Sequence, residues 1–180
     1  MNLMRPGGTR EEREHRWYRL AIVLAIIMFI LVAPEVNDGN QMDPTIKDGQ
    51  VLVTSKTSFT EKRGMPERGQ LVILKKPFSQ DAGADDNIIT RVIGLPGDTV
   101  EISEGKVLIN GEEYIAPGGI KGCKGQLDKV EIGKGQVFVL CDNRDTKQKL
   151  DSRNEKIGVM DSREIKGKVL ARIWPPGKLK

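Results

Sequence analysis

The residue types of this 180-residue chain leave few routes to catalysis. Its one histidine, His15, lies before an uninterrupted apolar run at residues 20–33 and is separated by it from the polar residues that follow. Without an imidazole, neither a serine nor a cysteine is activated in the Ser-His-Asp or Cys-His manner. A lysine whose pKa is lowered by burial is the remaining common base for a serine nucleophile. A hydrolase built from this chain is therefore expected to pair a serine with a lysine.

Other functional classes find little support. Cys123 and Cys141 are the only thiols, so we expect neither a His/Cys metal centre nor a bound cofactor. No glycine-rich phosphate loop opens a helix after a strand, which argues against nucleotide binding. The net charge of +4 forms no basic stripe, which argues against nucleic-acid binding. The cysteines either form one intramolecular disulfide or, in the case of Cys141, supply a small buried side chain.

A short segment after the apolar run, residues 36–46, is suited to presenting one side chain. Asp38-Gly39 is typical of a tight turn, because glycine tolerates positive φ. Pro44 fixes its own φ and favours an extended conformation for the residue before it. The side chain between them is Gln41. Its amide is neither a nucleophile nor a general base.

The apolar run predicts a membrane anchor. Residues 17–36 would span about 30 Å as a helix, which matches the hydrocarbon core of a bilayer. A cleavable signal peptide lacks its small-x-small site here, and a buried core helix would need a polar face. Five arginines precede Pro34, so the positive-inside rule places the N-terminus in the cytoplasm. We therefore expect a single-pass protein of the cell membrane, in contact with lipid, with a cytoplasmic tail at 1–16, a transmembrane helix at 17–36 and an extracytoplasmic domain at 37–180.

From residue 50 onward the pattern is that of β structure. Short β-branched runs bounded by glycines or charges predict strands at 50–54, 70–74, 88–93, 99–102, 106–109, 136–140 and 167–174. Ser103-Glu104-Gly105 predicts a tight hairpin between the fourth and fifth of them. Polar insertions at 55–69, 79–87 and 116–128 predict loops. The expected fold class is mostly β, a barrel or sandwich of short strands behind one N-terminal helix.

Three ordered motifs carry a resemblance to a known family. The segment Gly39-Asn-Gln-Met-Asp-Pro-Thr-Ile46 (the first box) resembles the Gly-x-Ser-Met-x-Pro-Thr-Ile/Leu motif of type I signal peptidases, the membrane-anchored Ser/Lys proteases of peptidase family S26. Arg91-Val-Ile-Gly-Leu-Pro-Gly-Asp98 (the second box) matches that family's second motif residue for residue. Asp142-Asn-Arg144 and Asp151-Ser-Arg153 (together the third box) are similar to its last motif. The resemblance implies a signal-peptidase-like β-barrel ectodomain with a cytoplasmic N-terminus.

The departures from the family pattern affect its chemistry. Gln41 stands where the resemblance places the nucleophilic serine, and Thr90 stands where it places the general-base lysine. Cys141 replaces a usual glycine, and residues 145–150 lack the serine that helps to orient the lysine. Losing nucleophile or base costs on the order of 10⁶ in turnover in another serine protease. We therefore expect no catalysis by this dyad.

The motif residues that remain are interpreted as scaffold, with a second role in lining a retained peptide groove. Glycines and prolines shape turns, and the charged residues of the third box form ion pairs. An extended peptide would bind by β-strand addition, which needs main-chain groups but not the dyad. The residues concerned are Gly39, Asn40, Met42, Pro44, Thr45, Arg91, Gly94, Pro96, Gly97, Asp98, Asp142, Asn143, Arg144, Asp151, Ser152 and Arg153.

Three hypotheses follow. The first is a non-catalytic signal-peptidase homologue that binds an exported protein; inactive relatives in this family are associated with surface pilus assembly, which makes a pilin the expected client and a pilus-assembly sortase a neighbour. The second is an active signal peptidase with a non-standard nucleophile, for which Thr90 and Cys141 are the candidates. The third is a structural or regulatory membrane protein without a peptide ligand.

Overall fold

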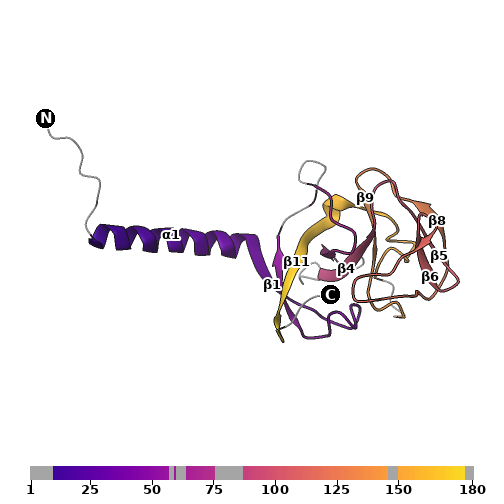
Figure 1. Ribbon diagram of the computed structural model, residues 1–180, viewed down its shortest axis with the longest axis horizontal. Coiled ribbons are helices and arrows are strands. Elements are labelled where there is room, and N and C mark those ends of the chain that lie inside the picture. Colours follow the sequence, from indigo (N-terminus) through magenta and orange to yellow (C-terminus); the bar gives the residue numbers. More distant parts are fainter. Residues whose placement is uncertain (1–9, 57–58, 60–63, 76–86, 146–149, 177–180) are drawn as a thin grey trace.

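The fold is a curled β domain with one long helix at its N-terminal end (Figure 1). The structure, a computed structural model, describes residues 10–56, 59, 64–75, 87–145 and 150–176. Helix α1 spans Arg10–Leu31 and projects away from the β domain in Figure 1. Its described apolar side chains, among them Trp17, Leu20 and Leu24, are about half exposed or more. The helix is therefore not part of the domain's core.

Helix α1 differs at both ends from the helix predicted at 17–36. It begins seven residues earlier, at Arg10, and it ends at Leu31, because residues Val32–Val36 form strand β1. Proline cannot donate within a helix, whereas valines favour a strand, and Pro34 lies between Val32 and Val36. Strand β1 pairs antiparallel with β2, Val51–Ser55, in the register Val32↔Ser55 to Val36↔Val51. Among the residues that the structure describes, no helix combines the length and the apolar character needed to cross a membrane.

The larger sheet has seven strands in the order β1-β2-β11-β3-β4-β9-β10, all paired antiparallel. Its remaining members are β3 (Leu71–Lys75), β4 (Asn87–Gly94), β9 (Gln136–Leu140), β10 (Met160–Asp161) and β11 (Ile165–Trp174). The C-terminal strand β11 therefore lies between β2 and β3. The sheet curls strongly, since the Asn87 amide of β4 donates to the Glu35 carboxylate of β1 at 2.9 Å although three strands lie between them.

The smaller sheet has four strands in the order β7-β6-β5-β8. They are β5 (Thr99–Ser103), β6 (Lys106–Ile109), β7 (Glu112–Glu113) and β8 (Leu127–Glu131). The predicted hairpin is confirmed: Ser103 pairs with Lys106, and Glu104 and Gly105 both have positive φ, as a primed hairpin turn requires. A short 3₁₀ helix, Ser162–Glu164, precedes β11.

Three apolar clusters bury both faces of β4. Ile88 and Val92 pack with residues of β3 and β9, whereas Ile89 faces the first box and Ile93 faces the smaller sheet. Gly94 has no room for a side chain next to the smaller sheet, because a Cβ there would be 2.1 Å from Ile132 Cδ1 and 2.8 Å from Val100 Cγ2. The second box therefore begins within β4, a strand with apolar residues packed on both of its faces.

The mostly β fold class is confirmed, and each of the seven predicted strands appears within two residues of its expected bounds. Strands β1, β7, β8 and β10 were not predicted. Strands β7 and β10 have two residues each, and β8 carries charges on an edge where the alternation of apolar and polar residues is weak. Of the insertions predicted at 55–69 and 79–87, residues 57–58, 60–63 and 79–86 lie outside the described residues.

Candidate functional site

The first box is part of a loop between β1 and β2 that its own polar groups hold in shape. The buried Asn37 side-chain amide donates to the carbonyl oxygens of Gly39 and Lys47, both at 3.0 Å. The Gly39 N–H in turn donates to the Asp48 carboxylate at 2.8 Å. Gly39 has a φ of +97°, a conformation that favours glycine. Sequence reasoning missed Asn37 and Asp48, although asparagine and aspartate next to glycine are typical of such loops.

Gln41 lies in a narrow crevice between the end of β1 and the start of β4. A Cβ placed on Gly39 would be 2.6 Å from Gln41 Oε1, so the amide lies over that glycine. Gln41 shares with Val36 and Ile88 a cavity of only about 10 Å³. The residue that follows it, Met42, is fully buried under β2, β3 and β4. The amide is therefore held against the body of the domain.

Thr90 offers no accessible hydroxyl. It lies on β4 directly after Ile88 and Ile89, two residues that line the crevice of Gln41. Its side chain is fully buried, and Oγ1 has no hydrogen-bond partner. A hydroxyl without a base and without solvent contact has no means of losing its proton. The position that the family resemblance assigns to the general base therefore holds an inert group.

A buried ion pair joins the second box to the third. Arg91 donates from Nε to Asp142 Oδ1 at 2.8 Å and from Nη2 to Asp142 Oδ2 at 2.5 Å. Both side chains are essentially fully buried. Arg91 also donates from Nη1 to the Gly69 carbonyl at 2.7 Å and from Nη2 to Thr45 Oγ1 at 3.5 Å. One guanidinium thus connects all three boxes.

The third box also clamps the first through Asn143. Its backbone N–H donates to the Gln41 carbonyl oxygen, and its side-chain amide donates to the Asn40 carbonyl oxygen, both at 2.9 Å. These contacts fix the main chain on both sides of the position where active relatives carry a nucleophile. The three boxes, which are widely separated in sequence, are therefore brought together around residue 41.

The second half of the third box supports β9. Arg153 donates to Asp151 through Nε and Nη2, and the Asp151 carboxylate accepts the Cys141 N–H at 2.9 Å. Ser152 Oγ accepts the Val139 N–H at 3.0 Å. Burial alone would lower the pKa of Arg153, but the hydrogen bonds and the charge of Asp151 raise it above its ordinary value. This pair was predicted as scaffold, and its geometry fits that role.

The end of the second box forms the predicted turn. The Asp98 N–H donates to the Leu95 carbonyl at 3.0 Å, and the Leu95 N–H donates back to the Asp98 carboxylate at 2.7 Å, across Pro96 and Gly97. Arg68 forms an ion pair with Asp98 at 2.9 Å. Burial works to raise the pKa of Asp98, but the hydrogen bonds from Arg68, Leu95 and Asn110 outweigh it and lower that pKa.

The two cysteines are free thiols, so the predicted alternative of a disulfide is not realised. They belong to different clusters: Cys141 packs beneath the first box with Met42, and Cys123 packs against the smaller sheet. Burial, together with the nearby charge of Asp151, raises the pKa of the Cys141 thiol well above its ordinary value. Cys141 therefore stays protonated and is a poor nucleophile.

Thiol titration tests this assignment. In 5,5′-dithiobis(2-nitrobenzoate) without reductant, the native chain should react slowly, because both thiols are buried. After unfolding in guanidinium chloride, two thiols per chain should react at once. A total below two thiols in the unfolded chain would mean that a disulfide had formed.

One predicted ion pair is missing. Arg144 was expected to pair with the acidic residues of the third box, but Asp142 is paired with Arg91 and Asp151 with Arg153. The buried Arg144 side chain leaves Nε and Nη2 without a hydrogen-bond partner. Within the described residues no group of three or more metal-ligating side chains is present.

Taken together, the geometry defines a peptidase-like β domain whose nucleophile and base positions hold an amide and a buried hydroxyl. The chain belongs to the signal peptidase family, peptidase S26, whose profile matches residues 15–174. It is similar to signal peptidase I of Bacillus licheniformis, with 32% identity over 82% of both chains. It is also similar to signal peptidase IB of Staphylococcus aureus (strain COL), with 31% identity over 88% of this chain and 86% of that protein. A signal peptidase I structure from Enterococcus faecalis V583 aligns with a TM-score of 0.44 and 24% identity, over 59% of this chain and 97% of that one.

Proposed function

We propose that the protein is a non-catalytic, membrane-anchored signal peptidase homologue that binds an extended segment of an exported protein. The observation that carries this proposal is the contrast between an intact frame and absent chemistry. Arg91, Asp142 and Asn143 hold the three boxes together around residue 41. At the same time Gln41 cannot act as a nucleophile, and the buried Thr90 hydroxyl cannot act as a base.

A free strand edge supports peptide binding. Strand β4 pairs with β3 over Asn87–Arg91, but its pairing with β9 starts only at Arg91. Among the described residues, no strand occupies the second edge of residues 87–90, and this edge faces the segment from Val36 to Gln41 across the narrow crevice. An added peptide strand would satisfy the free main-chain groups there. The crevice would have to widen, which a displacement of the Gln41 side chain allows.

Helix α1 supports attachment to a membrane. Its exposed apolar residues have no protein partner in the described chain and would be stabilised by lipid. Arginines precede them, which favours a cytoplasmic N-terminus and an extracytoplasmic domain. Extraction of bacterial membranes at alkaline pH checks this placement: the chain should stay in the membrane pellet, whereas a peripheral protein would be released.

The client class rests on the family resemblance. Inactive members are associated with pilus assembly, so a pilin is the proposed client and a pilus-assembly sortase the proposed neighbour. The named relatives favour a second candidate function, since they are called signal peptidases I and IB. Neither Thr90 nor Cys141 offers that candidate an accessible nucleophile, because both are fully buried.

One experiment separates the two candidates. The full-length chain, in detergent, is incubated with a precursor that carries a signal peptide. It is also titrated with the precursor and with a pilin, each labelled with a fluorophore. We expect saturable binding and no cleavage by mass spectrometry. Cleavage that Thr90→Ala or Cys141→Ala abolishes would establish the active peptidase instead. No binding of either precursor or pilin would leave only a structural or regulatory protein.

A further inference from the structure

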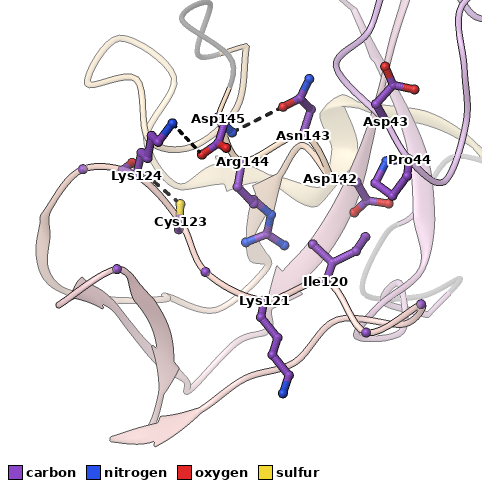
Figure 2. Close-up of a pocket in the computed structure, with 15 residues that line it drawn as sticks. Asp43, Pro44, Ile120, Lys121, Cys123, Lys124, Asp142, Asn143, Arg144 and Asp145 are labelled. Atoms are coloured by element: carbon purple, nitrogen blue, oxygen red, sulfur yellow. Dashed lines mark hydrogen bonds and ion pairs between the residues drawn. The ribbon is translucent and has the colours of Figure 1, made fainter.

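A separate cavity of about 510 Å³ lies beside the boxes (Figure 2). The first half of the third box forms one wall, and the loop at residues 118–125 forms the opposite wall. Asp43 and Pro44 close one end, but neither Gln41 nor Thr90 lines the cavity. Its volume falls within the range of about 300–1,000 Å³ that is typical of ligand pockets. The cavity is therefore large enough to hold a side chain of a bound peptide.

Two arginines near the cavity, Arg91 and Arg153, each pair with a carboxylate in the same way. The edge of a guanidinium formed by Nε and Nη2 presents two parallel N–H donors, which match the two oxygens of a carboxylate. Arg91 uses this edge for Asp142, and Arg153 uses the same edge for Asp151. In both cases the carboxylate comes from the third box of the chain itself.

Arg144 is the exception. It is as deeply buried as Arg153, with 6% of its surface exposed, yet Nε and Nη2 are the two atoms that lack a partner. In Figure 2 its guanidinium extends into the cavity, towards the wall formed by Ile120 and Lys121. Burial lowers the pKa of this guanidinium, because the cation has lost its water without gaining a partner. Nε and Nη2 each have less than 1 Å² of solvent-accessible surface, so a ligand in the cavity reaches this edge when the guanidinium turns further towards it.

The other charges of the cavity leave that edge unopposed. Both oxygens of Asp142 accept from Arg91, and Asp145 forms an exposed ion pair with Lys124 at 3.3 Å. Figure 2 shows the Asp43 carboxylate turned away from Arg144. None of the described carboxylates around the cavity therefore accepts a hydrogen bond from Nε or Nη2 of Arg144, although the charges of Asp142 and Asp151 favour the cation.

Half of the residues that the opposite wall contributes, at 118–125, are glycines. Gly118, Gly119 and Gly122 all have positive φ, which other residues rarely adopt. A Cβ at Gly119 would meet no atom within 4 Å. The glycines keep their part of the wall bare, so a side chain can approach Arg144 from this direction.

We propose that this cavity binds a carboxylate, supplied by an aspartate or glutamate side chain of the client peptide, through Nε and Nη2 of Arg144. The source of the carboxylate rests on the proposed function, whereas the site itself does not. A two-donor edge suits a planar carboxylate, whereas a tetrahedral phosphate would call for further cations. Of the two lysines that line the cavity, Lys124 is engaged by Asp145, and Figure 2 shows the Lys121 side chain extending away from Arg144. The chain would thus select clients that carry an acidic residue at a set distance from the strand added at β4.

The test compares peptides that carry one glutamate with otherwise identical peptides that carry glutamine at the same position. A series of client-derived peptides with blocked ends carries a single glutamate, moved one position at a time, and each has a glutamine counterpart. Binding to the full-length chain in detergent is measured by fluorescence anisotropy. At one position we expect the glutamate peptide to bind about tenfold or more tightly than its glutamine counterpart, as for a hydrogen bond to a buried charge. Arg144→Gln should abolish this preference, whereas the exposed Arg163→Gln should keep it.

Sodium propionate, titrated as a free carboxylate, serves as the second arm. It should raise the melting temperature of the wild-type chain and of Arg163→Gln, but not that of Arg144→Gln, with sodium chloride as the ionic-strength control. If Arg144→Gln does not fold, Arg144→Lys takes its place, and the wild-type comparison of glutamate with glutamine peptides needs no variant.

The outcomes are distinguishable. Peptides that bind without any preference for glutamate would overturn the carboxylate site and leave the proposed function standing. Stabilisation by propionate that depends on Arg144, without binding of any peptide, would overturn the proposed function and leave the site as a receptor for small carboxylates. A lack of both peptide preference and propionate stabilisation would overturn the carboxylate site entirely.

Discussion

A Gln41→Ser, Thr90→Lys double variant is expected to cleave a signal-peptide precursor at a rate about 10²-fold or more above that of the native chain. The three boxes already hold the main chain around residue 41, because Asn143 bonds to Asn40 and Gln41. A lysine at position 90 would be fully buried as Thr90 is, and burial lowers a lysine's pKa towards that of a general base. Full restoration would be worth on the order of 10⁶, so this gain assumes an imperfect fit. Mass spectrometry of the precursor measures it.

The single variants provide the control. Gln41→Ser alone has a nucleophile without a base, and Thr90→Lys alone has a base without a nucleophile. Because dyad members act as a unit, both single variants should match the native chain. If the double variant folds, as judged by circular dichroism, and leaves the precursor intact, then the crevice has diverged beyond the two exchanged side chains.

Asp142→Asn is expected to lower the free energy of unfolding by about 3–5 kcal/mol. The substitution keeps the size of the side chain but removes the charge opposite Arg91, whose guanidinium is only 2% exposed. An unpaired buried cation is costly, and Arg91 also anchors Thr45 and Gly69, so both the stability and the arrangement of the boxes should suffer. Urea unfolding followed by tryptophan fluorescence or circular dichroism gives the value.

Asp145→Asn is the matched control, since it is the same change three residues later. Asp145 pairs with Lys124, but both side chains are more than half exposed, so the loss should be below about 1 kcal/mol. Equal effects of the two substitutions would mean that the Arg91–Asp142 pair does not stabilise the fold as its burial suggests.

Much of this fold can be predicted from local sequence patterns. Strands such as Gln136–Leu140 consist of β-branched and aromatic residues, and the hairpin at Glu104-Gly105 needs only its turn residues. The end of α1 is harder, because the apolar run continues through Val32 and Ala33, which belong to a strand only through the pairing of β1 with β2. A short apolar stretch is compatible with a helix and with a strand, so periodicity cannot separate them there.

The candidate site, like the fold, can be predicted from the sequence only in part. The types of residue at positions 41 and 90 are enough to predict the loss of the dyad. The choice of partners is not local: Asp142 pairs with Arg91, fifty-one residues earlier, rather than with its neighbour Arg144. Sequence proximity favoured the wrong arginine, whereas the pairing of β4 with β9 places Arg91 opposite Leu140, two residues before Asp142. Because Asp142 pairs with Arg91, Arg144 is left without a carboxylate partner beside its cavity. The order of residues in the sequence does not predict this.

The position of β11 in the sheet sets an order for folding. Strands β1 and β2 carry the first box between them, yet the ladder that joins β2 to β3 runs through β11, the last strand of the chain. A polypeptide that emerges N-terminus first therefore cannot complete its larger sheet until Trp174 is available, and such distant pairings form late. Residue 41 acquires its final surroundings only in a finished molecule. A protein truncated before Ile165 should thus retain neither the crevice nor the clamp from Asn143, and under the proposed function a nascent chain could not yet bind its client.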